Sequence, residues 1–278
     1  MSSSNRMASV LLALYKNINR SGLLNFDWAQ SAFVSGYFAY KKYLEDANAK
    51  FVKNYPALFR GGHILDIGAN IGYTAYIFSQ ALAKPYKVFA FEPEQRNVAI
   101  LRKVANSYHF NDNLVITAAA VGDKEGEIEL WQNDGHHADH RVITEEFRKQ
   151  LKGTIQTQKI PLTTIDQFLQ LKNASHPIAF IKIDVQGYEL AVCHGMEATL
   201  KANPQCVVGF EYCPSIMEAL GYRAAELIKF FQDKKYFFYR LNKNGTLNLF
   251  DVTTNKDIKL GKDYQGYFDI ICSQQNLI

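Results

Sequence analysis

The stretch ILDIGANIGYT, residues 64–74, decides the fold of this chain. It starts as an apolar run, passes through Gly68 and Gly72, and continues into a helical pattern that extends to about Ala83. Glycines let the backbone turn sharply, and free N–H groups at a helix start favour a carboxylate or a phosphate. The order strand, glycine loop, helix therefore predicts a ligand pocket at the carboxyl end of this strand.

Two acids frame the loop and indicate which ligand it binds. Asp66 stands directly before the glycines, where a carboxylate suits a ligand that carries an ammonium group, such as the amino-acid end of methionine. Glu92 follows a second apolar run, twenty positions after Gly72, about where an acid hydrogen-bonds ribose hydroxyls in nucleotide-binding βαβ folds. The spacing Gly-x-x-x-Gly lacks the third glycine of the dinucleotide fingerprint, which disfavours a nicotinamide cofactor. An ordinary turn followed by a solvated acid stays open for each residue taken alone.

Short apolar runs alternate with longer amphipathic stretches from residue 63 onward. This alternation indicates βαβ units, with a helix after each run, and such apolar strands must be covered on both faces of a mostly parallel sheet. The predicted strands are 63–67, 87–91, 114–119, 178–183 and 206–210. Near the C-terminus, residues 236–241 and 246–250 flank Lys243-Asn244-Gly245, which predicts a hairpin, and 267–272 predicts an antiparallel strand that closes the sheet.

Two regions stand outside this alternation. Residues 1–58 are rich in Leu, Ala, Tyr and Phe without strand-like alternation, which predicts a helical N-terminal extension to a domain at 59–278. Residues 131–159 are polar and predict a lid-like insertion. This insertion contains His136, His137 and His140, for which three interpretations stay open: a solvated loop, a lid in which His137 accepts a proton, or part of a metal site.

Charged residues at the ends of two later strands are the candidate catalytic groups. Asp184 follows an apolar strand at the edge where ligands gather, and Lys182 lies two residues back, on the same face, where it could keep Asp184 ionised. Glu211 ends the next strand and points to the same edge. Asp184 is predicted to act as a base, although a divalent cation held by Asp184 and Glu211, or a helix-capping role for Asp184, stays open.

Five motifs in this order resemble the FkbM family of methyltransferases. They are LDIGANIGYTA (65–75), FEPEQRNVAILRKVAN (91–106), AAVGDKEGEIEL (119–130), IKIDVQGYELAVCHGM (181–196) and VVGFEY (207–212). The resemblance implies a class I methyltransferase fold, which is a doubly wound, Rossmann-like α/β fold with a mostly parallel seven-stranded sheet. It also implies S-adenosylmethionine as the methyl donor and a hydroxyl acceptor on a sugar, a polyketide or a related small molecule.

The resemblance also assigns the cofactor-binding residues, position by position. They are Asp66, Gly68, Asn70, Gly72, Glu92, Val121 and Asp123. Val121 would contact the adenine ring, and Asp123 would accept a hydrogen bond from its exocyclic amine. The chain departs from the family pattern Lys-x-Asp-x-Glu-Gly because Gln186 replaces the second acid, which keeps open an alternative without turnover, a protein that only binds S-adenosylmethionine. A nicotinamide-dependent oxidoreductase is the other alternative.

Composition limits the partners and the cellular location. A net charge of +4 with evenly scattered Lys and Arg does not indicate a nucleic-acid surface, and no run of about 18 apolar residues predicts a membrane span. The four cysteines form no zinc spacing, so we expect them to be reduced and we predict no metal site. The apolar run near the N-terminus lacks a cleavage site, which predicts a cytoplasmic protein. The N-terminal helices could also serve a homo-oligomer.

Overall fold

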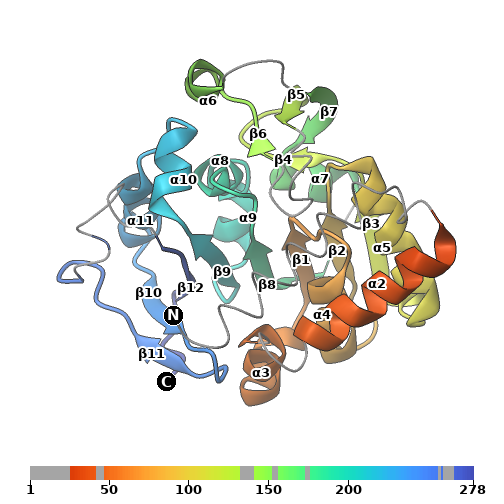
Figure 1. The fold of residues 1–278 in the computed structure, drawn as a ribbon. Helices are drawn as coiled ribbons and strands as arrows, with labels where there is room; N and C mark the ends of the chain where they lie inside the picture. Colours follow the sequence, from red (N-terminus) through yellow and green to blue (C-terminus); the bar gives the residue numbers. More distant parts are fainter. Residues whose placement is uncertain are drawn as a thin grey trace, which may run out of the picture.

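The computed structural model describes residues 26–41, 47–131, 141–151, 156–172, 176–255, 258 and 266–278. A main sheet of eight strands crosses the molecule in the order β11-β10-β12-β9-β8-β1-β2-β3 (Figure 1). Its strands are β1 His63–Ile67, β2 Val88–Phe91, β3 Leu114–Thr117, β8 Ile178–Ile183, β9 Val207–Tyr212, β10 Phe237–Leu241, β11 Leu247–Leu249 and β12 Phe268–Ser273.

The five strands from β3 to β9 run parallel, and β12, β10 and β11 are antiparallel to their neighbours. The prediction of a mostly parallel sheet is confirmed. The predicted count of seven strands was wrong, because the short strand β11 pairs with β10 and adds an eighth strand at the edge. The predicted strand at 267–272 is present as β12, but it lies between β9 and β10.

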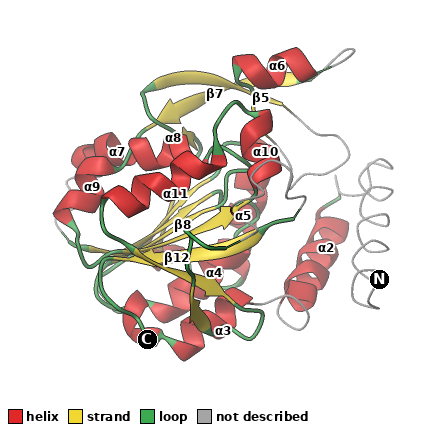
Figure 2. Ribbon diagram, turned by 90° about the vertical axis from the view of Figure 1, so that its left-hand side faces the viewer, coloured by secondary structure: helices red, strands yellow, loops and turns green. Residues whose placement is uncertain are grey.

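Helices cover both faces of the main sheet, as a doubly wound fold requires (Figure 2). Successive side chains of a strand point to opposite faces, so Ile64 packs with Phe78 on one face and Leu65 packs with Phe210 on the other. The first face is covered by α2 Asp27–Tyr40, α3 Ala47–Asn54, η3 Pro56–Phe59, α4 Tyr73–Ala81 and α5 Gln95–Ser107. The second is covered by α7 Ile165–Leu171, α8 Glu189–His194, α9 Glu197–Ala202, α10 Pro214–Ala219 and α11 Ala224–Asp233.

A smaller sheet follows β3, where the sequence predicts one longer strand and then a helix. The run at 114–119 ends as β3 at Thr117, and the chain then enters the second sheet in the order β4-β7-β5-β6. Its strands are β4 Ala120–Val121, β5 Gly126–Trp131, β6 Arg141–Val142 and β7 Thr157–Thr163, with α6 Glu145–Gln150 beside them (Figure 1). Leu130, Val142 and Phe147 form their own core cluster, so the described part of 131–159 packs as a folded layer.

The described part of residues 1–58 is helical and packs into the main core. Phe38, Phe51 and Phe59 are buried from α2, α3 and η3, and the rings of Phe51 and Phe59 contact Phe180 of β8. The division between an N-terminal extension and a domain at 59–278 stays a prediction. Within the described ranges, no helix is long and apolar enough to cross a membrane.

The predicted C-terminal hairpin is confirmed. β10 and β11 pair antiparallel around Gly245, which has a φ of +76°, and the N–H of Asn242 donates to the carbonyl of Thr246 at 2.9 Å. A positive φ is the conformation that glycine adopts without steric cost. The turn lies against the N-terminal helices, because the hydroxyl of Tyr55 accepts from the N–H of Leu247 at 3.2 Å.

Candidate active site

The loop between β1 and α4 is held in shape by its own N–H groups. The N–H groups of Gly68 and Ala69 both donate to the carbonyl of Phe91 at 3.0 Å. Gly68 and Gly72 have φ values of +83° and +93°, and a Cβ on Gly68 would overlap the carbonyl of Asp184. The N–H groups of Gly68 and Ala69 therefore bind the protein itself, and ligand binding by the N–H groups at the start of α4 stays a prediction.

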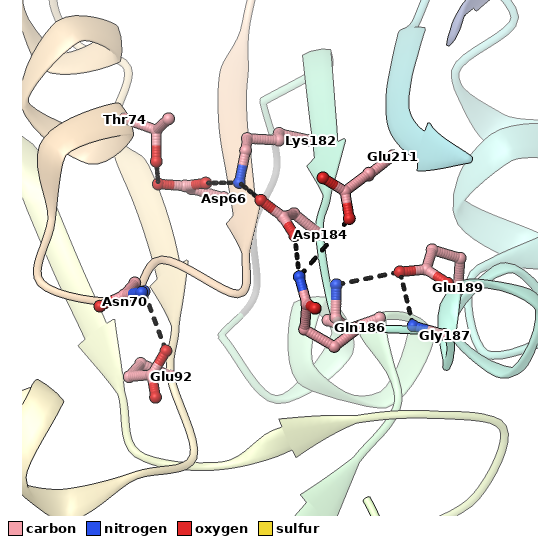
Figure 3. A network of polar contacts seen from close by, with 11 residues as sticks. Asp66, Asn70, Thr74, Glu92, Lys182, Asp184, Gln186, Gly187, Glu189 and Glu211 are labelled. Atoms are coloured by element: carbon pink, nitrogen blue, oxygen red, sulfur yellow. Dashed lines mark hydrogen bonds and ion pairs between the residues drawn. The ribbon is translucent and has the colours of Figure 1, made fainter. Parts of the chain in front are cut away.

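Glu92 connects the end of β2 to this loop (Figure 3). Its Oε2 accepts from the N–H of Asn70 at 2.9 Å, and its Oε1 accepts from the N–H of Glu94 at 3.0 Å and from the amide of Asn97 at 3.2 Å. Burial raises the pKa of Glu92 to about 7, although these three hydrogen bonds oppose the rise. Glu92 lines the cavity described below.

Asp66 faces a cation of the protein itself. Its Oδ2 accepts from the hydroxyl of Thr74 at 2.7 Å, and its Oδ1 lies 3.6 Å from the Nζ of Lys182, its register partner on β8 (Figure 3). Asp66 is completely buried, and burial raises its pKa while Lys182 and Thr74 oppose the rise. The predicted contact between Asp66 and a ligand ammonium stays a prediction, and Lys182 already occupies one side of this carboxylate.

Charged side chains form a row across four strands on the face covered by α2 to α5. Asp66 pairs in register with Lys182, and Glu211 of β9 pairs in register with Asp269 of β12. Lys182 also lies 3.3 Å from Oδ2 of Asp184, as the sequence predicted. Burial alone would lower the pKa of Lys182, but Asp184 and Asp66 raise it above its ordinary value. Lys182 is therefore a fixed positive charge among carboxyl groups.

The amide of Gln186 lies between two of these acids. Its Nε2 is 3.1 Å from Oδ1 of Asp184 and 3.5 Å from Oε2 of Glu211 (Figure 3). Burial, and then the neighbouring Asp184 and Asp269, raise the pKa of Glu211 to about 9. Burial and Asp184 also raise the pKa of Asp269 to about 6.

Glu189 anchors the loop that carries Gln186. Its Oε1 accepts from the N–H groups of Val185 and Gly187, each at 3.1 Å, while its Oε2 is buried without a hydrogen-bond partner. Burial raises the pKa of Glu189 to about 7, because the charged form loses its hydration.

A cavity of about 290 Å³ opens where these groups meet. Its polar side is formed by the loop between β1 and α4, by Glu92, and by the charged row on β8 and β9. Apolar residues of the second sheet and its connections form another side, including Val121, Leu130 and Val142. The N-terminal helices contribute Tyr37, Lys41 and Asn48.

Most of the predicted site residues line this cavity. They are Gly68, Asn70, Glu92, Val121, Lys182, Asp184 and Glu211. Asp66 is not a lining residue, and its carboxylate lies against Lys182. Gly72 is not a lining residue either; it shapes the loop, and a Cβ added to it would overlap the side chain of Leu101. Asp123 is exposed and is not among the lining residues. His137, with the other histidines of its segment, lies outside the described residues.

Several residues near the site were not predicted from the sequence. The sequence does contain a signal for Asp269, because it is the one acid in the apolar run YFDIIC, residues 267–272. Tyr37, Lys41 and Asn48 had none, because nothing in a helical segment shows that it will reach a distant sheet edge. Among the described residues, no group of three or more His, Cys, Asp or Glu is placed to hold a metal ion.

Comparison with solved structures finds similar chains of low sequence identity. A methyltransferase FkbM from Methylobacillus flagellatus KT has a TM-score of 0.45 and 13% identity, covering 77% of this chain and 44% of that chain. An O-methyltransferase from Bacillus cereus in complex with SAH has a TM-score of 0.47 and 15% identity, covering 82% and 80% of the two chains. A putative O-methyltransferase from Klebsiella pneumoniae has a TM-score of 0.49 and 10% identity, covering 83% and 81%. This chain thus spans less than half of the Methylobacillus protein.

Comparison by sequence gives the family. No curated protein matches the chain. The family model of the methyltransferase FkbM domain matches residues 66–238, which begin at Asp66, directly before the loop between β1 and α4, and end within β10. This match covers more than half of the 278 residues. The chain therefore belongs to the FkbM family of methyltransferases.

Proposed function

We propose that this chain transfers a methyl group from S-adenosylmethionine to a hydroxyl oxygen of a small molecule, such as a sugar or a polyketide. The observation that carries this proposal is the single cavity shared by the Gly68–Gly72 loop, Glu92 and the pair Asp184 and Glu211. A donor site and a proton acceptor thus meet at the carboxyl ends of parallel strands, where ligands of such sheets bind.

The cavity suits the donor in polarity and approximate size. Its volume of about 290 Å³ lies near the lower end of the range for ligand pockets, which is about 300 Å³ upward. Val121 and the apolar side would receive the adenine, Glu92 would accept from the ribose hydroxyls, and the Gly68–Gly72 loop with Asp66 would hold the methionine end. Asp123 would need to approach the exocyclic amine from its exposed position.

When bound, S-adenosylmethionine supplies a methyl group that its positively charged sulfur already activates. The protein then has to orient the acceptor in line with the bond that breaks, and to remove one proton. Asp184 would take the proton of the acceptor hydroxyl, so that the acceptor oxygen can receive the methyl group that the donor would supply. Lys182 holds Asp184 in place from the side of β8. His137 stays a second candidate for the proton acceptor.

The acceptor would lie between the end of the charged row and the N-terminal helices. Tyr37, Lys41 and Asn48 line the cavity from this side, so we propose that they contribute to acceptor specificity. The amide of Gln186 donates to both Asp184 and Glu211, and a divalent cation that bridges these two carboxyls would have to displace these contacts. We therefore propose a transfer without metal. A cytoplasmic location, a homo-oligomer and the absence of nucleic-acid binding stay predictions.

Isothermal titration of the purified chain with S-adenosylhomocysteine, and separately with NAD, tests the donor site. We expect micromolar binding of S-adenosylhomocysteine alone. The variant Glu92→Ala should weaken this binding at least tenfold, because it removes the carboxylate that would accept from the ribose hydroxyls.

The matched control is Glu94→Ala, two residues further on. Glu94 is also buried, but it caps α5 by accepting from the N–H of Asn97, and it does not line the cavity. This variant should lose about 1 kcal/mol of stability and keep its affinity. No binding of S-adenosylhomocysteine, or a preference for NAD, would refute the proposed function. Given binding, a screen of hydroxylated acceptors with donor radiolabelled on the methyl group tests the oxygen as target.

A further inference from the structure

One neutral side chain joins the two acids at the acceptor end. The Nε2 of Gln186 approaches Oδ1 of Asp184 and Oε2 of Glu211 at 3.1 and 3.5 Å (Figure 3). Each hydrogen of one amide group can serve one of the two carboxyls. We propose that Gln186 is a positioning residue that holds Asp184 and Glu211 together as a carboxyl pair, and that this pair keeps one proton at neutral pH.

The backbone fixes Gln186 in this position. Gln186 has a φ of +54° and Gly187 a φ of +98°, so the chain turns in the left-handed region at both residues. Glu189 accepts from the N–H groups on either side of Gln186, and a Cβ on Gly187 would overlap Ile216. A left-handed residue other than glycine persists where the surrounding structure determines it. The amide is therefore carried by an anchored loop.

The charges around the pair favour one proton. Two carboxyls that approach each other cannot both ionise without mutual repulsion, and the amide of Gln186 adds hydrogen bonds but no charge. The positive charge of Lys182 lies on the Asp184 side, 3.3 Å from Oδ2. The other ionisable groups near the pair are Asp66 on β1, Asp269 on β12, Glu189 on α8, Cys213 after β9, and Lys41 after α2, which acts on Asp269.

These surroundings place the proton on Glu211. Burial and the charges of Asp184 and Asp269 raise the pKa of Glu211 to about 9, above neutral pH. Asp184, in contact with Lys182, is then the carboxylate of the pair, and Glu211 is a neutral carboxyl that can donate a hydrogen bond. If the proposed function holds, the acceptor meets one group that takes a proton and one that donates. Two neighbouring oxygens on the acceptor would complement this pair.

Carbon NMR of the full chain, with labelled side-chain carboxyls, tests the pair without any substrate. The variant Glu211→Gln identifies the Glu211 signal. We expect this signal to titrate near pH 9 in the unaltered chain. The variant Asp184→Asn should lower the midpoint of the Glu211 titration by about 1 pH unit, because it removes a neighbouring charge.

The role of Gln186 is tested by repeating the Asp184→Asn comparison in a Gln186→Leu background. If Gln186 holds the pair together, the effect of Asp184→Asn on Glu211 should fall to less than half. Gln186→Met, an unbranched chain of similar length, provides the same test should Gln186→Leu misfold. Gln232→Leu, on an exposed position of α11, is the matched control and should leave the effect unchanged.

Two results would overturn the inference. A Glu211 titration midpoint below pH 7 would show that the pair keeps no proton at neutral pH. An undiminished effect of Asp184→Asn in both Gln186 backgrounds would show that Gln186 does not position the pair. Neither measurement requires a bound donor. Failure to bind S-adenosylhomocysteine would therefore refute the proposed function separately from this inference.

Discussion

The acids at the carboxyl ends of β1 and β2 are held differently from those at the carboxyl ends of β8 and β9. At the β1–β2 end, Asp66 and Glu92 are 0% and 5% exposed, and neighbouring groups of the protein engage both oxygens of each carboxylate. At the β8–β9 end, the side chain of Asp184 is 35% exposed. There, Asp184 and Glu211 are joined by a single amide, one of whose contacts is at the 3.5 Å limit.

This difference fits the proposal that the β1–β2 end binds the donor and the β8–β9 end binds the acceptor. A buried end whose acids are held by several groups of the protein is preorganised for a ligand that never changes, which matches the proposed donor. An end at which the side chain of Asp184 reaches solvent can engage an acceptor and move a proton. The predictions below test whether the two ends are separable, and they run from the largest expected effect to the smallest.

Asp184→Asn should abolish most of the chemistry while leaving the donor end intact. Loss of a general base lowers the rate of transfer by roughly 10²- to 10⁴-fold, whereas affinity for S-adenosylhomocysteine should stay within about threefold. Single-turnover transfer to an acceptor from the screen, measured beside a binding titration, gives both values. If the variant keeps its rate of transfer, Asp184 is not the base, and His137 is the next candidate.

Glu189→Gln should stabilise the protein at alkaline pH. The pKa of Glu189 rises from 4.5 to about 7 on folding, so between these values the folded chain holds a proton that the unfolded chain has released. Stability that is present below pH 4.5 is therefore lost as the pH rises to about 7. The neutral variant avoids this loss, by up to about 3 kcal/mol at pH 8, with little effect at pH 4.

Urea unfolding at both pH values checks this prediction. The control is Glu127→Gln, an exposed position on β5, which should change neither value by more than about 0.5 kcal/mol. A variant that is equally destabilised at both pH values would instead show that Glu189 is needed as a hydrogen-bonding group and that its buried charge costs little.

Gly72→Ala should damage the donor end alone. Its φ of +93° strains any other residue, and the added methyl would overlap Leu101 of α5, so we expect a loss of about 1 to 3 kcal/mol in stability and weaker binding of S-adenosylhomocysteine. Gly36→Ala is the matched control, since α2 offers open space at that position. That exchange should stabilise the protein by about 0.5 to 1 kcal/mol. Equal effects of the two exchanges would contradict the assignment of Gly72.

Donor binding should weaken in mild acid. The pKa of Glu92 is raised to about 7, and ribose hydroxyls donate best to an ionised carboxylate. Affinity for S-adenosylhomocysteine should thus be about tenfold lower at pH 6 than at pH 8. Glu92→Gln should bind more weakly at pH 8 and lose this dependence. A steep dependence that survives in Glu92→Gln would assign the proton to another group.

Sequence patterns predicted the elements well where the signal was local. The strand before the Gly68–Gly72 loop and the hairpin around Gly245 are present, and the described part of residues 1–58 is helical. The run at 114–119 was predicted less well, because it ends as β3 at Thr117 and the chain enters the second sheet at Ala120. There, the N–H of Gly122 donates to the carbonyl of Thr163, more than forty residues later. Apolar periodicity cannot show which sheet a short strand will join.

The sequence by itself determined the family, the positions of the main-sheet strands along the chain and the glycine loop, because these follow from motifs of a few residues with their own conformational preferences. Only the tertiary structure decided which groups satisfy one another. Lys182 occupies one side of Asp66, Gln186 joins Asp184 to Glu211, and the N-terminal helices reach the cavity. These contacts depend on the register between strands and on packing across the sheet, and neither is encoded within a local stretch of sequence.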